Sequence, residues 1–186
     1  AFNQNIGILS KNEFKIYNSS GKEEKTLNLE ITTPLIDSAN RYLAIGENKG
    51  KKMYLIADKE IVWEKEIEGN ISQIKVNQNG YVAISVIDTS YKTVVVMYDE
   101  KGNELFRRFF RSTRVEDISI SNDSKYLAIA EVDTSGTIIK SNIEIISTEA
   151  AKTDSENPVV KRIEGTNNDL ITKIKYQEKN KLVCMY

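Results

Sequence analysis

The sequence contains no histidine, one cysteine and two prolines in 186 residues. Without an imidazole group, it has no Ser-His-Asp triad, no Cys-His pair and no histidine-ligated metal. The single cysteine, Cys184, forms neither an intramolecular disulfide nor a multi-cysteine zinc site. These absences exclude several common kinds of catalytic and metal-binding site.

An excess of charge of one sign is also lacking, because 26 basic residues face 27 acidic ones and the net charge is −1. This balance gives no general attraction to nucleic acid or to anionic lipid. No apolar run approaches the roughly 18–20 residues of a membrane span, and residues 1–5 do not begin a signal peptide. Since the chain does not begin with methionine, we expect a processed product or a part of a longer protein.

Helical periodicity is scarce, whereas short runs rich in β-branched and aromatic residues recur along the whole chain. Clear examples are residues 81–87, 93–98 and 126–132. Polar turns rich in Asn, Asp, Ser, Gly and Lys separate these runs. Many short strands with regular turn signals predict an all-β sandwich, barrel or propeller.

Internal repeats favour the propeller. Four segments share the order strand, polar turn, apolar strand, and their aligned positions Tyr42, Tyr81, Tyr126 and Lys181 are 39, 45 and 55 residues apart. A four-stranded propeller blade takes about 40–50 residues. The longest spacing contains the polar stretch 147–158, which we expect to be a flexible loop inserted within a blade. We therefore predict a β-propeller of four-stranded antiparallel blades, with a β-sandwich as the alternative.

The strand that follows each polar turn is apolar on both of its faces, as in residues 126–130. A sheet with one wet face alternates apolar and polar residues, whereas a blade between two neighbours buries both faces. Ala44, Ala83 and Ala128 occupy one aligned position. Their small side chains predict a place where neighbouring sheets approach closely.

Two motifs resemble those of known propellers. Residues 122–129 (NDSKYLAI) resemble the S-P-D-G-K-Y-L-A element of WD40-like blades. Residues 98–106 (YDEKGNELF) resemble the D-x-x-G-x-x-x-W hairpin of PQQ-repeat blades, with Phe106 where tryptophan is usual. The order of segments also resembles a Gram-positive family of unknown function, whose members have an N-terminal membrane anchor and an extracytoplasmic propeller. This resemblance implies an extracytoplasmic, membrane-anchored location through an anchor outside this chain, with a cytoplasmic location as the alternative.

The blade pattern divides the chain into one partial propeller domain over residues 1–186. Expected blades cover residues 1–31, 32–70, 71–112 and 113–168, and residues 169–186 begin an incomplete blade. About four blades lie at the low end of the 4–8 that close a ring. We expect either a fragment of a longer propeller or an arc whose open blade edges pair with a second copy of the chain.

One segment interleaves basic and aromatic residues, and its candidate site residues are Arg107, Arg108, Arg111 and Arg114. Such an arginine strip can bind phosphates, stack bases or hold an anionic ligand or partner. The alternative is an outer strand whose arginine stems cover apolar surface. The balanced charge around the strip favours this second interpretation.

Other conspicuous residues have structural explanations. Trp63 is expected to pack an outer strand onto the next blade and not to stack a ligand, and Cys184 is expected to be a small core residue. Seven aspartates lack the dense spacing of a calcium loop, and we expect them to cap turns and strand ends. They are Asp37, Asp58, Asp88, Asp99, Asp117, Asp123 and Asp133.

The sequence predicts a non-catalytic propeller that acts as a protein-interaction or ligand-sensing module, without a cofactor or metal. Its partner is expected to be an unidentified protein or cell-envelope component. A quinoprotein-like oxidoreductase is one alternative, since PQQ-repeat blades carry that chemistry elsewhere, but the calcium pattern and cysteine pair of such enzymes are missing. Binding of nucleic acid or another anion through the arginine strip is the other alternative, and the near-neutral charge does not favour nucleic acid.

Overall fold

A computed structural model describes residues 4–10, 12–154, 158–165 and 170–186. Within these ranges the chain is almost entirely β-structure, as predicted, with one short α-helix and one 3-10 turn. The elements are β1 (Ile6–Ser10), β2 (Glu13–Tyr17), β3 (Glu23–Asn28), β4 (Pro34–Ala39), β5 (Tyr42–Glu47), β6 (Lys52–Ala57), β7 (Glu60–Glu66), β8 (Asn70–Val76), β9 (Val82–Ile87), β10 (Thr93–Tyr98), β11 (Glu104–Phe110), β12 (Thr113–Ile120), β13 (Tyr126–Asp133), β14 (Lys140–Ser147), α1 (Thr148–Thr153), β15 (Val159–Glu164), β16 (Lys173–Tyr176), η1 (Glu178–Asn180) and β17 (Leu182–Met185). No helix in the described ranges is long and apolar enough to cross a membrane.

Each strand pairs antiparallel with its neighbour in the sequence, so the chain folds into successive meander sheets. Three sheets have four strands: β4 to β7, β8 to β11, and β12 to β15. A three-stranded sheet, β1 to β3, precedes them, and a two-stranded sheet, β16 and β17, follows them. Four-stranded antiparallel sheets are the blades that the repeat pattern predicted.

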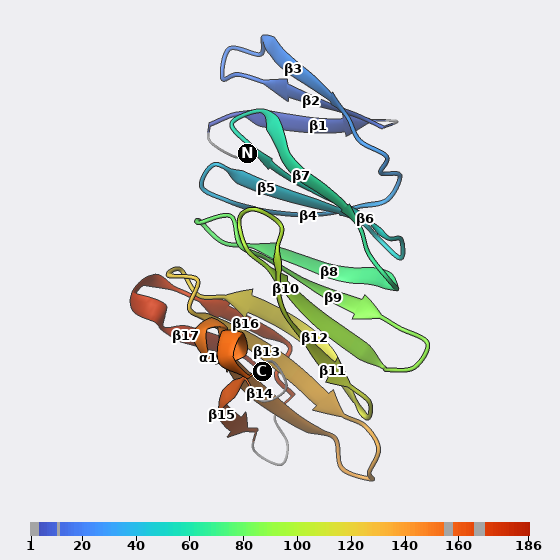
Figure 1. The fold of residues 1–186 in the computed structure, drawn as a ribbon, viewed down its shortest axis with the longest axis vertical. Helices are drawn as coiled ribbons and strands as arrows, with labels where there is room; N and C mark the ends of the chain where they lie inside the picture. The colour runs from blue at the N-terminus through green and yellow to red at the C-terminus, as the bar shows by residue number, and fades with distance from the viewer. Residues whose placement is uncertain (1–3, 11, 155–157, 166–169) are drawn as a thin grey trace.

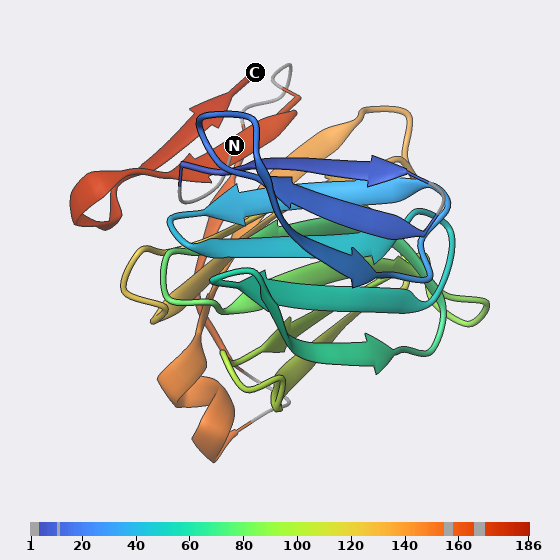
Figure 2. The same cartoon turned by 90° about the horizontal axis from the view of Figure 1, so that it is seen from above.

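The sheets stack face to face along the long axis of the molecule (Figure 1) and fan out when seen from above (Figure 2). Their first strands lie side by side, because β4 contacts β8, β8 contacts β12, and β12 contacts β16. Meander sheets whose first strands converge on one axis form the arc of a propeller. The predicted propeller is therefore present, and the alternative β-sandwich is wrong.

Apolar clusters fill the space between consecutive sheets. Ala44, Ala83 and Ala128 are fully buried in three of these clusters, at the aligned position predicted for close approach. Burial of one Ile or Leu side chain contributes about 1.5–3 kcal/mol. The stack is thus held mainly by contacts between blades, and each blade depends on its neighbours.

The first sheet lacks an inner strand among the described residues. In the complete sheets a β-bulge interrupts the pairing of the third and fourth strands, as at Leu55/Ile56 and Met97/Tyr98. The same bulge occurs at Ile16/Tyr17 between β2 and β3. The strands β1, β2 and β3 therefore correspond to the second, third and fourth strands of a blade.

Among the residues that the structure describes, the last sheet has two strands and no outer ones. Val183 on β17 lies opposite Lys175 on β16, just as Ala83 on β9 lies opposite Lys75 on β8. β16 and β17 are therefore the first and second strands of a blade. Over the described ranges no strand pairs with the inner edge of β1 or with the outer edge of β17.

The polar stretch 147–158 differs from its prediction as a flexible loop. Residues 148–153 form α1, while residues 155–157 lie outside the described ranges. The helix begins because the Ser147 hydroxyl accepts the N–H of Ala150, and Glu149 places negative charge in its first turn. Thr148 donates its hydroxyl to backbone carbonyls of the β12–β13 turn, and Ala151 is buried. The insertion is thus docked onto its own blade and onto β11 of the preceding blade.

Candidate functional site

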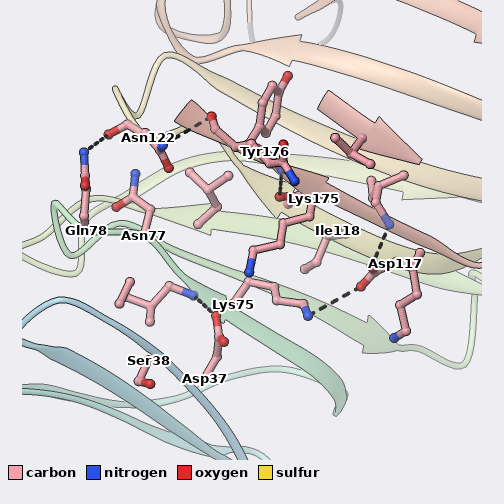
Figure 3. Close-up of a pocket in the computed structure, with 18 of the residues that line it drawn as sticks. Asp37, Ser38, Lys75, Asn77, Gln78, Asp117, Ile118, Asn122, Lys175 and Tyr176 are labelled. Atoms are coloured by element: carbon pink, nitrogen blue, oxygen red, sulfur yellow. Dashed lines mark hydrogen bonds and ion pairs between the residues drawn. The ribbon is translucent and has the colours of Figure 1, made fainter. Parts of the chain in front are cut away.

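A cavity of about 710 Å³ lies on the concave side of the first strands. Its walls come from β4, β8, β12, β16 and β17 and from the turns at one end of these strands (Figure 3). Ligand pockets commonly measure about 300–1,000 Å³. The concave face is therefore the candidate site of this protein.

Four residues stand at the same level on the four inner strands. The strand registers place them opposite Ala44, Ala83, Ala128 and Val183, and they are Asp37, Lys75, Ser119 and Lys175. All four line the cavity. Since alternate residues of a strand share a face, Asp117 and Lys173 line it one step further along β12 and β16.

The acceptor side chains of this face connect one inner strand to the next. The Asp37 carboxylate accepts the N–H of Val76 at 2.8 Å, and the Ser119 hydroxyl oxygen accepts the N–H of Tyr176 at 2.9 Å. The Asp117 carboxylate accepts the N–H of Ile174 at 3.0 Å. These groups align neighbouring blades, and they replace backbone pairing between sheets.

The two aspartates of the face lie in different electrostatic surroundings. Burial raises the pKa of Asp37, although the Val76 N–H and the nearby Lys75 ammonium oppose that rise. Asp117 is almost wholly buried, and the Lys75 Nζ lies 3.6 Å from its Oδ1. That separation exceeds the length of a normal hydrogen bond. Lys75 therefore balances Asp117 without being tightly held by it.

Lysines outnumber carboxylates on the concave face. Lys75 on β8 and Lys175 on β16 extend their side chains into the cavity from either side of β12 (Figure 3). Lys173 and Lys175 are exposed, and within the described ranges neither forms an ion pair. With Asp37 and Asp117 as the aspartates of the lining, the face carries one more positive charge than negative.

Burial also keeps two other cavity residues uncharged. It raises the pKa of Tyr176 to about 12 and raises the pKa of the Cys184 thiol. Both groups are therefore protonated at neutral pH. Cys184 is half-buried on β17, in partial agreement with its prediction as a core residue.

Amide side chains tie the turns together at one end of the cavity. The Asn77 Nδ2 donates to the carbonyl of Ser121 and to the Ser124 hydroxyl, at 2.9 and 2.7 Å. Gln78 donates to the carbonyl of Asn122, and Asn122 in turn donates to the carbonyl of Gln177 (Figure 3). These bonds fix the rim of the cavity across three successive blades.

The structure divides the arginine strip between the two faces of its sheet. Arg107 forms two hydrogen bonds with Glu104, at 2.6 and 2.9 Å, and reaches toward Glu68. Arg108 turns to the next sheet and forms two hydrogen bonds of 2.9 Å with the buried Glu144. Both charges are therefore compensated inside the protein.

The other two arginines of the strip remain on the surface. The Arg111 guanidinium lies over the Tyr91 ring, 5.4 Å from its centroid, and Arg114 is exposed on β12. The four arginines do not form one continuous patch. A role for Arg111 and Arg114 in binding an anion stays a prediction.

Over residues 1–186 the sequence matches the family described as "Family of unknown function (DUF5711)". The chain belongs to this family. Among curated proteins, none matches the DUF5711 chain.

Solved structures similar to the DUF5711 chain are propellers. The β-propeller domain of Cps50 (Swd1) from Myceliophteria thermophila matches with a TM-score of 0.63 and 13% identity, over 99% of this chain and 62% of that one. Hsv2p of Kluyveromyces lactis matches with a TM-score of 0.61 and 14% identity, over 98% and 61% of the two chains. KlHsv2 with loop 6CD replaced by a Gly-Ser linker matches with a TM-score of 0.61 and 13% identity, over 92% and 55%. The DUF5711 chain thus has the propeller fold and spans less than two thirds of the propellers that it matches.

Trp63 of the DUF5711 chain packs between sheets, as predicted. Its ring lies 6.2 Å from that of Tyr98, and a Cβ added at Gly102 would come within 3.1 Å of it. Among the aspartates, Asp88 and Asp99 accept N–H groups of their own turns, as expected for capping. Asp123 and Asp133 do the same.

Asp37 and Asp117 differ from the capping prediction, because they bind the next inner strand. The concave residues were missed in the sequence, although a signal was present. In three of the four repeats the strand before the turn holds a polar residue between two apolar ones, as in Ile74-Lys75-Val76 and Ile174-Lys175-Tyr176. Within the described ranges, no three acidic or cysteine side chains are close enough together to hold a metal ion.

Proposed function

We propose that this chain is a non-catalytic binding module whose concave face takes a ligand or a segment of a partner protein. The observation that carries the proposal is the cavity of about 710 Å³ lined by the first strands of four successive blades. Backbone groups of these strands accept or donate in cross-links between blades, whereas the Lys173 and Lys175 side chains form no ion pair within the described ranges. The backbone of the face is therefore held in place, while its lysine side chains can contact a ligand, as a recognition surface requires.

A site-specific cross-linker tests this proposal in the cell that makes the protein. A photoreactive residue replaces Ser38, which is exposed on β4 and lines the cavity. The control places the same residue at Val62, which is 45% exposed on the outer strand β7. We expect a discrete adduct at position 38 and none at position 62. Equal labelling of both positions, or labelling of neither, would contradict a binding role for the concave face.

The location of the protein is part of the same proposal. We propose that the chain is the extracytoplasmic part of a membrane-anchored bacterial protein, on the strength of the order of its segments. Fractionation of cells that carry the parent gene should recover the protein with the membrane. Protease added outside intact cells or spheroplasts should degrade it. Recovery in the soluble cytoplasm would refute the proposed location.

The open edges of β1 and β17 provide a second place for a partner. A strand edge with unpaired N–H and C=O groups favours pairing with another chain. Exposed side chains near these edges include Ile6 and Ile8 on β1 and Met185 on β17. Light scattering after size exclusion measures whether a second copy of the chain binds there. A monomer at every concentration would eliminate the homodimer.

A further inference from the structure

We infer that Lys75, Lys173 and Lys175 form an anion-binding site on the concave face, and that its ligand is a small molecule with at least two negatively charged oxygens. This inference rests on the proposed binding role of that face. It adds the chemical class of the ligand and the residues that recognise it.

The first reason for an anion site is the position of Lys75 and Lys175 on the inner strands. Asp37 and Ser119 stand at the same level as Lys75 and Lys175, and each accepts an N–H from the next inner strand. An ammonium group is a donor without acceptor capacity, so a lysine cannot make that bond. Lys75 and Lys175 therefore do not make this backbone connection between blades, although Lys75 lies 3.6 Å from Asp117 of the next inner strand. Their ammonium groups point into the cavity (Figure 3).

The second reason is the charge balance of the lining. Asp37 and Asp117 are each engaged by a backbone N–H, at 2.8 and 3.0 Å. Lys75 lies 3.6 Å from Asp117, while Lys173 and Lys175 form no ion pair within the described ranges. The Lys175 charge opposes the burial-driven rise in the pKa of Asp37, but neither Lys173 nor Lys175 is held in an ion pair within the described ranges. A bound anion would supply one.

A hydroxyl group adds a neutral donor to the site. Ser119 is 9% exposed and lies between Lys75 and Lys175 in the order of the inner strands. Its oxygen accepts the N–H of Tyr176, which leaves the O–H proton free to donate into the cavity. One hydroxyl and three ammonium groups are suited to an oxyanion and not to a cation.

The lysine side chains limit the chemical groups of the ligand, and the volume of the cavity limits its size. An ammonium group is a compact point charge, whereas arginine offers a planar fork for bidentate pairing. Three lysines without arginine therefore recognise charge and spacing, which phosphate and carboxylate groups both provide. A volume of about 710 Å³ fits a small molecule. The shared chemistry is a ligand with two or more oxyanion groups.

Calorimetric titration with two probes tests the site. Pyrophosphate represents phosphate ligands and citrate represents carboxylate ligands. We expect one of them to bind the intact chain with a stoichiometry of one and to bind more weakly as salt increases. Lys175→Met keeps the length of the side chain and removes its charge. It should weaken binding about tenfold or more, as loss of a charged hydrogen bond does.

Lys161→Met is the matched control, because Lys161 is equally exposed on a strand but lies on the outer strand β15. It should bind the probe as the unchanged protein does. Asp37→Asn gives a change of the opposite sign, since removal of a negative charge beside the lysines should strengthen binding. A gain of affinity cannot arise from misfolding.

Two results would overturn the anion site. One is the absence of binding for both probes at millimolar concentration. The other is binding that Lys75→Met and Lys175→Met leave unchanged. If either result occurs while the cross-linker at position 38 still labels a partner, the concave face binds something other than an anion. Failure of both experiments would reject the proposed function itself.

Discussion

Arg108 on β11 and Glu144 on β14 form two hydrogen bonds of 2.9 Å across the boundary between two blades. The carboxylate is fully buried, and Arg162 on β15 donates to it as well. Glu131 lies 3.7 Å from Arg162 and accepts the Thr113 hydroxyl at 2.6 Å. Ionic contacts therefore join these blades outside the apolar core, and Arg162 is shared by the two buried carboxylates.

Glu144→Ala should destabilise the protein strongly. Removal of the carboxylate leaves two arginines facing each other in a partly buried place. Loss of one partner from a buried ion pair costs about 3–5 kcal/mol. Because Arg108 and Arg162 are 28% and 51% exposed, solvent screens their charges, and the free energy of unfolding, measured by urea denaturation, should fall by less than that, about 1–3 kcal/mol.

Glu149→Ala is the control for this change, because Glu149 pairs with Lys152 on the surface of α1 and both side chains are exposed. A surface pair of this kind contributes no more than about 0.5 kcal/mol. If the two variants lost the same free energy of unfolding, the ion pairs of Glu144 would contribute no more to stability than a surface pair.

The same network makes stability depend on acid. Burial raises the pKa of Glu144, but hydrogen bonds from Arg108 and Arg162 outweigh burial and hold the pKa below the ordinary value of 4.5. Because the folded protein binds this proton more weakly than the unfolded chain, the contribution is complete above pH 4.5 and is lost as pH falls through the lower, folded value. In the unchanged protein we expect the free energy of unfolding to decline as the pH falls below 4.5.

Glu144→Gln should make this decline shallower, since the variant has no proton to take up at this position. The measurement is a series of urea denaturations between pH 3 and 7, chosen as a range that spans the ordinary pKa of a carboxyl group (about 4). An identical pH dependence in both proteins would place the acid sensitivity at other carboxylates.

The sequence predicts the blades well because each repeat contains its own turn residues and its own small residue at the contact between sheets. Tyr81 follows a polar turn that ends in Gly80, and Ala83 follows at the point where two sheets meet. Such local signals need no knowledge of distant contacts. The concave site is different, because Lys75 and Lys175 are 100 positions apart and line one cavity only when the blades fan around an axis.

The arginine strip shows the reverse limitation. In the sequence, Arg107 and Arg108 form one basic cluster, but adjacent residues of a strand point to opposite faces. Arg107 pairs with Glu104 on its own strand, whereas the partner of Arg108, Glu144, comes from the next sheet. The basic cluster seen in the sequence is therefore not a positive patch in the structure. The neutralisation of Arg108 depends on Glu144, which lies 36 positions away in the sequence.

Gly80→Ala should cost much more stability than Gly21→Ala. Both glycines have positive φ angles, +82° and +79°, so each alanine meets the same backbone penalty of about 1–2 kcal/mol. A Cβ at Gly80 would also lie 2.7 Å from the ring of Tyr42 in the preceding blade, whereas nothing lies within 4 Å at Gly21. Overpacking adds about 1–3 kcal/mol.

The difference between the two variants isolates the contact of Gly80 with the neighbouring blade. Thermal and urea denaturation measure it, and Gly21→Ala supplies the cost of the backbone alone. If both variants lost the same stability, the Tyr42 ring would be free to move aside, and close approach of the blades at this turn would not be needed.

The arginine strip should bind nucleic acid weakly or not at all. Glu104 and Glu144 already compensate Arg107 and Arg108, which leaves Arg111 and Arg114 as the charges that can reach a phosphate. Two phosphate contacts give a slope of about −2 for log affinity against log salt, and this supports no useful binding at physiological salt. Fluorescence anisotropy with a labelled DNA duplex across a salt series measures that slope. Arg111→Gln combined with Arg114→Gln should abolish the remaining binding. A slope of about −4 or steeper would mean that the ion pairs of Arg107 and Arg108 open to release both arginines to the DNA, and the strip would then be an authentic nucleic-acid site.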